Sequence, residues 1–263
     1  MSGAASIRPA DPRDWIASLS PVVAPQARVL LRLLDAAEGD PRIRALQVRG
    51  SLPRGTADEH SDVDALLRIA DGEYEAALAD MPSLVRSLGP TLDVLFEKPG
   101  SPFLFVQFRD GVQLELSGRR ASEARGRAPD VVVLLDRDGL LEQPYEPSPP
   151  WDRDLWLGWA WMALSGVDKY LRRGALWEAL TALEKARTLL LRHHAAVTGI
   201  EDPELGITSI LDFGGTLPDR LDETVARLDA ADIRRAAHVC AQLLERYERR
   251  PFGALVLERL RAS

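Results

Sequence analysis

The chain has a single cysteine, Cys240, among its 263 residues. No disulfide can therefore form within one chain, and no cluster of cysteines can bind zinc. So low a cysteine content is typical of a reducing compartment, and we expect a cytoplasmic protein. The first twelve residues contain no apolar run of the kind that marks a signal peptide. No stretch approaches the roughly 18 consecutive apolar residues of a membrane-spanning helix, so we expect no membrane partner.

Basic residues are in the minority, since 33 Lys and Arg against 40 Asp and Glu give a formal net charge of −7. Proteins that coat nucleic acid are normally basic, because contacts with phosphate supply most of the non-specific affinity. The charge balance therefore disfavours a long nucleic-acid partner and favours a small acceptor, for which a cationic molecule fits best. Hydrophobic residues make up 46% of the chain, enough for a buried core in one large domain or two small ones.

The first half of the chain mixes helical and strand-like patterns. Apolar residues recur at helical spacing over residues 21–38 and 73–88. Strands are expected at residues 43–49, 62–69, 91–97, 103–109, 112–117 and 131–135. Asp110-Gly111 stands between two of these runs, and this dipeptide is the strongest short signal for a β-hairpin.

The second half has a helical pattern throughout, beyond a proline-rich stretch at residues 144–150 that we interpret as a linker. Helices are expected at residues 151–167, 175–197, 217–228 and 231–261. The sequence therefore predicts the α+β class, with a mixed β-sheet flanked by helices and then a C-terminal helical bundle. We expect a catalytic domain over residues 1–143 and a helical, acceptor-binding domain over residues 151–263.

The segment that points to chemistry is residues 48–64, VRGSLPRGTADEHSDVD. A strand leads into Gly50-Ser51, ten residues follow, and an Asp-x-Asp pair opens the next strand. Gly50 has no Cβ, so the backbone there can turn sharply and approach a ligand. Ser51 adds a hydroxyl and a backbone N–H that can hold a phosphate. Because alternate side chains of a strand share a side, Asp62 and Asp64 are expected to project together.

Two aligned carboxylates are hard oxygen ligands of the kind that Mg²⁺ uses, usually together with substrate phosphates. Two-metal sites stabilise both the attacking and the leaving oxygen of an in-line displacement. Transfer of a nucleotidyl group needs this chemistry, because the α-phosphorus of a nucleoside triphosphate is attacked and pyrophosphate leaves. The alternative is that Asp62 only caps a turn and Asp64 is a solvated strand residue, although Asp is unfavourable in strands.

This segment resembles the signature of the DNA polymerase β-like nucleotidyltransferase superfamily. Residues 50–57 and 61–64 look like the small bacterial members, which include aminoglycoside nucleotidyltransferases and minimal nucleotidyltransferases. The resemblance implies Mg²⁺-dependent transfer of a nucleoside monophosphate, with ATP or another nucleoside triphosphate as donor. The implied acceptor is a hydroxyl of a small molecule such as an aminoglycoside-like antibiotic, which would make the protein an antibiotic-resistance enzyme. Members of the superfamily also carry a third carboxylate on a later strand, next to the metal pair.

Two residues compete for the role of the third carboxylate. Glu115 lies in the run at residues 112–117, and Asp93 lies in the run at residues 91–97, each between apolar neighbours. We prefer Glu115, because the third acid of the superfamily tends to follow a hairpin turn of this kind. Many relatives have Asp there, so Glu115 either binds the metal or takes the proton of the acceptor hydroxyl as a general base. A solvent-facing strand residue is the plainer alternative.

Basic side chains are expected near a triphosphate. Arg54 lies inside the motif loop, and relatives often place a basic residue of the C-terminal helices over the phosphates, for which Lys169 is the candidate. A solvated arginine and an ordinary surface lysine are the alternatives. The residues predicted to bind the nucleotide are Gly50, Ser51, Arg54 and Lys169, and those predicted to bind metal and catalyse are Asp62, Asp64 and Glu115. A basic patch is interpreted as a solvated loop; it consists of Arg119, Arg120, Arg125 and Arg127.

Three functions compete. The leading one is a small-molecule nucleotidyltransferase of the antibiotic-modifying type. The second is an enzyme that adenylylates a partner protein, as minimal nucleotidyltransferase antitoxins do, although those are usually shorter. The third is a non-catalytic nucleotide-binding relative, which would need a damaged metal site. The sequence leaves open the nucleotide base, the acceptor and the oligomeric state.

Overall fold

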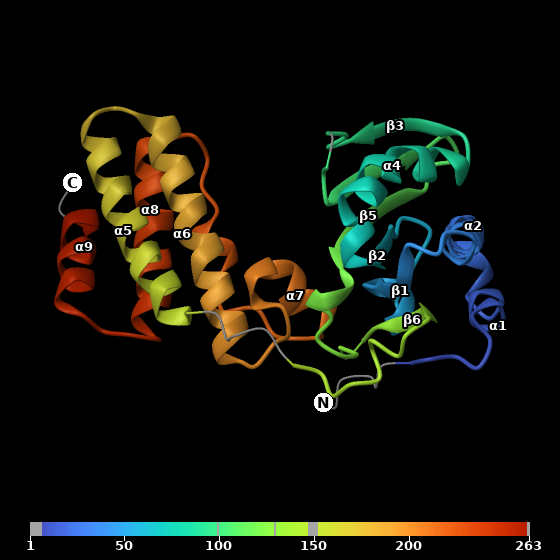
Figure 1. Cartoon of the computed structure of the whole chain (residues 1–263). Helices are drawn as coiled ribbons and strands as arrows, with labels where there is room; N and C mark the ends of the chain where they lie inside the picture. Colours follow the sequence, from blue (N-terminus) through green and yellow to red (C-terminus); the bar gives the residue numbers. More distant parts are fainter. Residues whose placement is uncertain (1–6, 99, 129, 147–151, 262–263) are drawn as a thin grey trace. The chain divides into compact units, whose positions relative to one another are not determined.

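The computed structural model describes residues 7–98, 100–128, 130–146 and 152–261. The chain divides into two compact units, Met1–Ser148 and Pro149–Ser263, which we call unit 1 and unit 2 (Figure 1). Part of the predicted linker, Pro147, Pro149 and Pro150, lies outside the described residues. The catalytic and acceptor-binding roles expected for the two parts stay predictions.

Unit 1 is built on a six-stranded mixed sheet with the order β3-β4-β5-β2-β1-β6 (Figure 1). The strands are β1 (Ile43–Arg49), β2 (Val63–Ile69), β3 (Thr91–Leu95), β4 (Phe103–Phe108), β5 (Gln113–Arg120) and β6 (Val132–Asp136). Strand β2 pairs with β5 in parallel, and the other pairings are antiparallel. All six predicted strands are present, with ends that differ by a few residues, and the predicted fold class is confirmed.

The hairpin predicted at Asp110-Gly111 joins β4 to β5. Gly111 has a φ of 96°, a left-handed conformation that glycine adopts without strain. The backbone N–H of Phe108 donates to the carbonyl of Val112 at 2.9 Å and closes the turn. This turn fixes the register of β5 and hence the position of every side chain on it.

One face of the sheet is covered by helices α2 (Ala24–Gly39) and α4 (Tyr74–Ser87). The residues of β2 that join the core with them are the alternate ones, Val63, Ala65, Leu67 and Ile69. Because neighbouring strand residues point to opposite sides, Asp64, Leu66 and Arg68 belong to the other face. Two short helices of unit 1 were not predicted, namely α1 (Pro12–Ala17) and α3 (Ser51–Arg54).

Unit 2 is a helical bundle with its own hydrophobic core. Its α-helices are α5 (Arg153–Arg172), α6 (Leu176–Val197), α7 (Ile207–Asp212), α8 (Ala230–Glu245) and α9 (Pro251–Arg261). The single helix predicted at residues 231–261 is wrong, because α8 ends at Glu245 and a new helix, α9, begins at Pro251. Proline is favoured at the first position of a helix, since it has no N–H to donate there.

The helix predicted at residues 217–228 is also wrong. This segment contains only a single 3₁₀ turn, Asp222–Thr224. Arg220 has a φ of 68°, which is incompatible with a right-handed helix. Helix α7, just before this segment, was missed because its six residues are too few to show a helical period.

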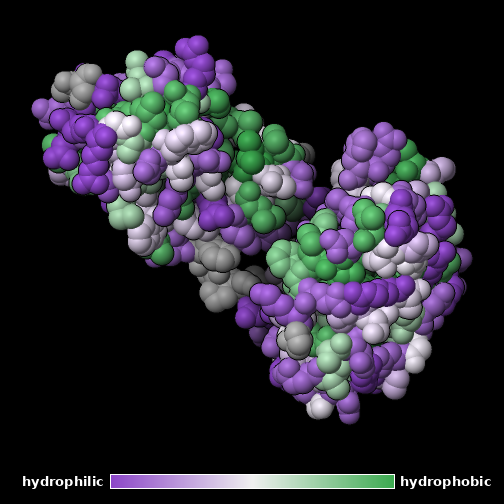
Figure 2. Space-filling model, turned by 90° about the horizontal axis from the view of Figure 1, so that it is seen from above, coloured by the Kyte–Doolittle hydropathy of each residue, from purple (hydrophilic) through white to green (hydrophobic). Residues whose placement is uncertain are grey.

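Hydrophobic side chains reach the surface of both units (Figure 2). In unit 1 the exposed ones include Leu92, Leu95 and Phe96 at β3, and in unit 2 they include Met162 and Trp177. Across the described ranges, every helix is too short or too polar to cross a lipid bilayer.

Candidate active site

The bend at Gly50 lies against a carboxylate. Strand β1 ends at Arg49, and Gly50 turns the chain into α3 with φ 78° and ψ −147°. These angles strain any residue with a side chain. A Cβ on Gly50 would lie 2.2 Å from Oδ2 of Asp64. The sharp turn expected at Gly50 is therefore present. The residue at this position must lack a Cβ because the carboxylate of Asp64 occupies the space.

The loop that leads to Asp62 is held by side chains. Oδ1 of Asp58 accepts hydrogen bonds from the backbone N–H of His60 at 3.0 Å and from the hydroxyl of Ser61 at 2.9 Å. Gln26 of α2 is only 2% exposed and donates from Nε2 to the carbonyl of Ser61 at 2.9 Å. The peptide directly before Asp62 is thus fixed to α2. Gln26 was not predicted, and the signal for it was a polar residue on the apolar face of a predicted helix.

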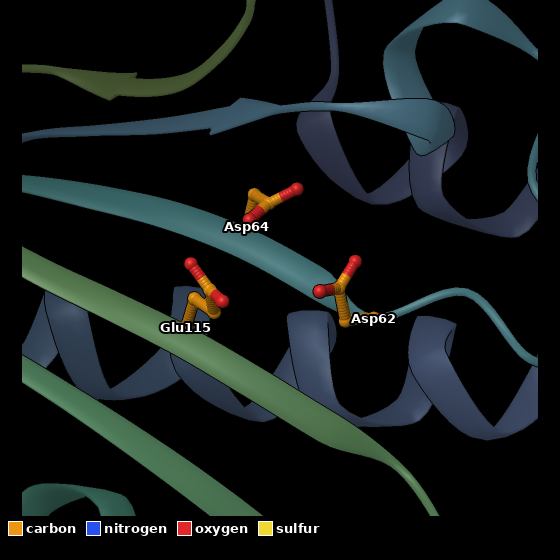
Figure 3. A group of neighbouring side chains, drawn as sticks. All are labelled: Asp62, Asp64 and Glu115. Atoms are coloured by element: carbon orange, nitrogen blue, oxygen red, sulfur yellow. The ribbon is translucent and has the colours of Figure 1, made fainter. Parts of the chain in front are cut away.

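Three carboxylates meet on the face of the sheet opposite α2 and α4. Asp62 directly precedes β2, Asp64 lies in β2, and Glu115 lies in β5 (Figure 3). The parallel register places Asp64 beside Glu115. One oxygen from each of the three side chains lies within 4.8 Å of the others. Within the ranges that the structure describes, this is the one group of three or more such side chains close enough to share a metal ion.

Asp93 is not part of this group. It lies on the edge strand β3, with β4 between it and the strand of Glu115. Two strand spacings amount to about 10 Å, too far for carboxylates to share an ion. Of the two residues considered for the third acid, the structure therefore brings Glu115 to the aspartates.

The pKa values of Asp64 and Glu115 are both raised above their ordinary values. Burial, and then the negative charges of Asp62 and Glu115, raise the pKa of Asp64 to about 6. Burial and the charge of Asp62 also raise the pKa of Glu115 above its ordinary value. Arg49, which pairs with Asp64 across β1 and β2, opposes both shifts, and Arg54 opposes the shift of Asp64. The arginines offset only part of the negative charge, and a divalent cation would offset the rest.

The donor set fits Mg²⁺. Three carboxylates offer hard oxygen ligands, which this ion prefers, and their spacing lets one ion contact more than one of them. The missing Cβ of Gly50 leaves room for the Asp64 carboxylate at the backbone bend. Asp62, Asp64 and Glu115 are therefore the residues that would hold the ion.

Binding of Mg²⁺ or Mn²⁺ is expected to weaken as the pH falls through about 6. Asp64 must lose its proton to bind the ion, and its pKa without metal is about 6. Below that value, the affinity should fall by up to about tenfold per pH unit. Isothermal titration calorimetry between pH 5 and 8 measures the affinity, and Asp93→Asn serves as the control that keeps the wild-type profile. An affinity that stays constant over this range would contradict the assignment of Asp64 as a ligand.

Arg54 and Lys169, two of the residues predicted to bind the nucleotide, lie in different units. Arg54 ends α3, and its charge acts on Asp64. Lys169 lies on α5 in unit 2, with its Nζ 4.4 Å from the centre of the Tyr170 ring. It lines a pocket of about 760 Å³ within unit 2, together with Trp177 and Lys185 of α6. The expected contact of each residue with phosphate stays a prediction.

Neither a protein-family model nor a curated protein matches the chain. Its structure is similar to an aminoglycoside 6-adenyltransferase from Bacillus subtilis at 14% identity, covering 89% of this chain and 90% of that one, with a TM-score of 0.34. It is also similar to the Bradyrhizobium diazoefficiens CD-NTase CdnG in complex with GTP, at 12% identity. This match covers 95% of this chain and 88% of that one, with a TM-score of 0.34. A third similar structure is the Elizabethkingia meningoseptica CdnE cyclic dinucleotide synthase with GTP and Apcpp, at 12% identity. This match covers 95% of this chain and 94% of that one, with a TM-score of 0.32. Identities and TM-scores are low, so the function proposed below depends on the carboxylates and on the strands that carry them.

Proposed function

We propose that the protein is a metal-dependent nucleotidyltransferase, which moves a nucleoside monophosphate from a nucleoside triphosphate onto a hydroxyl of a small molecule. The observation that carries this proposal is the group of three carboxylates, Asp62, Asp64 and Glu115, beside the glycine bend at residue 50. When bound, Mg²⁺ would neutralise charge on the phosphate oxygens. A non-catalytic relative would have no need of three carboxylates held close enough to share an ion.

The transfer makes one bond and breaks one bond at the α-phosphorus. The acceptor oxygen bonds to this phosphorus, the bond to the bridging oxygen breaks, and pyrophosphate leaves with the electron pair. Glu115 accepts the proton of the acceptor hydroxyl, a role that its raised pKa suits. Ser51, which starts α3, and Arg54, which ends it, bind the triphosphate oxygens.

ATP is the proposed donor, and acceptor binding is the role proposed for unit 2. The pocket lined by Lys169 and Trp177 combines a cation with an exposed aromatic ring, which suits a phosphorylated or cyclic ligand. An aminoglycoside is the first acceptor to test, because of the motif and because one similar structure is named as an aminoglycoside 6-adenyltransferase.

The test begins with the nucleotide. Calorimetric titration of ATP, GTP, CTP and UTP should show binding of at least one of them that needs Mg²⁺ and is abolished by EDTA. The preferred nucleotide is then incubated with panels of aminoglycosides, lincosamides, sugars and sugar phosphates. A mass gain of one nucleotidyl group, which is a nucleoside monophosphate less one water, with release of pyrophosphate, is the expected result. Absence of Mg²⁺-dependent binding for all four nucleotides would refute the proposal.

A further inference from the structure

The face of the sheet that carries the carboxylates also carries a cluster of arginines. Because β2 and β5 are parallel and in register, Asp64 lies beside Glu115, and four residues later Arg68 lies beside Arg119. Alternate residues of a strand share a side, so all four side chains belong to the same face. The arginine pair follows the carboxylate pair by about 13 Å along the strands.

Arg68 and Arg119 have no ion-pair partner within the described residues. Nε of Arg68 is buried without a hydrogen-bond partner. Burial lowers the pKa of Arg68; Glu123 opposes this shift, whereas the charges of Arg119, Arg49 and Arg125 add to it. Like charges directly opposite on neighbouring strands destabilise a sheet. A bound anion would reduce the repulsion between the two guanidinium groups and would accept a hydrogen bond from Nε of Arg68.

The register also shows on which side of the carboxylates this cluster lies. Strand β1 runs antiparallel to β2, with Arg49 beside Asp64 and Ala45 beside Arg68. Gly50 continues β1 beyond Arg49, away from Ala45. The bend and the Arg68 cluster therefore lie in opposite directions from Asp64 along β2.

In an in-line displacement, the attacking and leaving oxygens are on opposite sides of the phosphorus. With the leaving pyrophosphate at the Gly50 bend, the acceptor approaches from the side of Arg68 and Arg119. Guanidinium groups bind phosphate through paired N–H donors, which makes arginine the preferred residue for this group.

We propose that Arg68 and Arg119, supported by Arg49 and Arg125, bind a phosphate group of the acceptor. The acceptor is then a phosphorylated hydroxy compound, such as a sugar phosphate, and not a polycation. This inference rests on the proposed nucleotidyl transfer. It differs from the expectation drawn from the net charge of −7, because several arginines surround Arg68 although the chain as a whole is negative.

Arg68→Met and Arg119→Met test the proposal, because each change keeps the aliphatic part of the side chain and removes the charge. Calorimetric titration of inorganic phosphate into the full chain, without metal, should show binding that each variant weakens about 10- to 100-fold. Arg109→Met is the matched control, since Arg109 is exposed beside the β4–β5 turn. The melting temperature of ligand-free Arg68→Met should stay the same or rise, whereas a structural role for Arg68 would lower it.

Transfer assays separate the sources of phosphate. Sugar phosphates should be modified and the matching sugars should not, and both variants should lower kcat/KM for the sugar phosphate with an unchanged KM for the nucleotide. A raised KM for the nucleotide alone would assign the cluster to the donor and overturn the proposal. Modification of aminoglycosides at an undiminished rate in both variants would overturn it while leaving nucleotidyl transfer intact. A third outcome is that the wild-type chain binds phosphate but no nucleotide, and that the two variants lose phosphate binding. This result would refute the proposed function and leave the anion site intact. Unchanged phosphate binding in both variants would refute the anion site.

Discussion

Asp64→Asn is expected to lower the rate of nucleotidyl transfer by about 1,000-fold or more, because a carboxylate shared with the ion stabilises the transition state by several kcal/mol. Asp64 is half-buried on the open face of the sheet, and Asn has the same shape, so the fold should persist. Steady-state release of pyrophosphate measures the rate. Asp93→Asn, an equally conservative change on the edge strand, should retain wild-type turnover.

The same substitution should stabilise the metal-free protein at neutral and alkaline pH. The pKa of Asp64 is about 6 in the fold against an ordinary 3.8, so its ionised form destabilises the native state. The penalty is absent below pH 3.8, grows between 3.8 and 6, and is complete above 6. A shift of this size corresponds to a free energy on the order of 2–3 kcal/mol.

Urea denaturation in EDTA at pH 4 and pH 8 compares the two proteins. Asp64→Asn should gain stability over the wild type at pH 8 and lose this advantage at pH 4. A variant that turns over at the wild-type rate, or that is less stable than the wild type at pH 8, would show that Asp64 has another role.

Gly50→Ala is expected to damage both the fold and the site. The left-handed backbone at Gly50 should cost an alanine about 1–3 kcal/mol of stability. The new Cβ would also lie 2.2 Å from Oδ2 of Asp64, so the carboxylate must rotate away from its position beside Glu115. Misplacement of a reacting group by about 1 Å can lower a rate by about 100-fold, and we expect kcat to fall by that factor.

Gly55→Ala is the matched control. Gly55 also has a left-handed φ, 70°, but no atom lies within 4 Å of the position of its missing Cβ. Gly55→Ala should lose part of the stability that Gly50→Ala loses, and its kcat should stay at the wild-type value. Equal values of kcat for the two variants, measured well below their melting temperatures, would show that the contact with Asp64 does not matter.

Local patterns predicted most of unit 1. The alternation of Val63, Ala65, Leu67 and Ile69 placed the aspartates on the opposite face of their strand, and Asp110-Gly111 set the hairpin that leads to Glu115. These features depend on neighbouring residues, whose geometry repeats every two positions in a strand. The same rules failed for residues 217–228, where apolar spacing favoured a helix that the left-handed backbone of Arg220 prevents.

Contacts between distant segments could not be predicted. The parallel pairing of β2 with β5 brings Arg68 and Arg119 together, yet nothing near either residue indicates the other. Arg119 was therefore interpreted as part of a solvated loop, although it lies in β5. Gln26 likewise lies on a different element from Ser61, whose carbonyl it holds.

The parallel pairing also has a consequence for the order in which the site forms. Asp62 and Asp64 lie two residues apart in the chain, whereas α4, β3 and β4 separate them from β5, whose docking beside β2 brings Glu115 to them. Closing so long a segment costs entropy before its contacts repay it, which makes such pairings slow. A nascent or truncated chain that ends before β5 would contain only two of the three carboxylates. Binding of the ion by all three therefore requires that β5 has paired with β2.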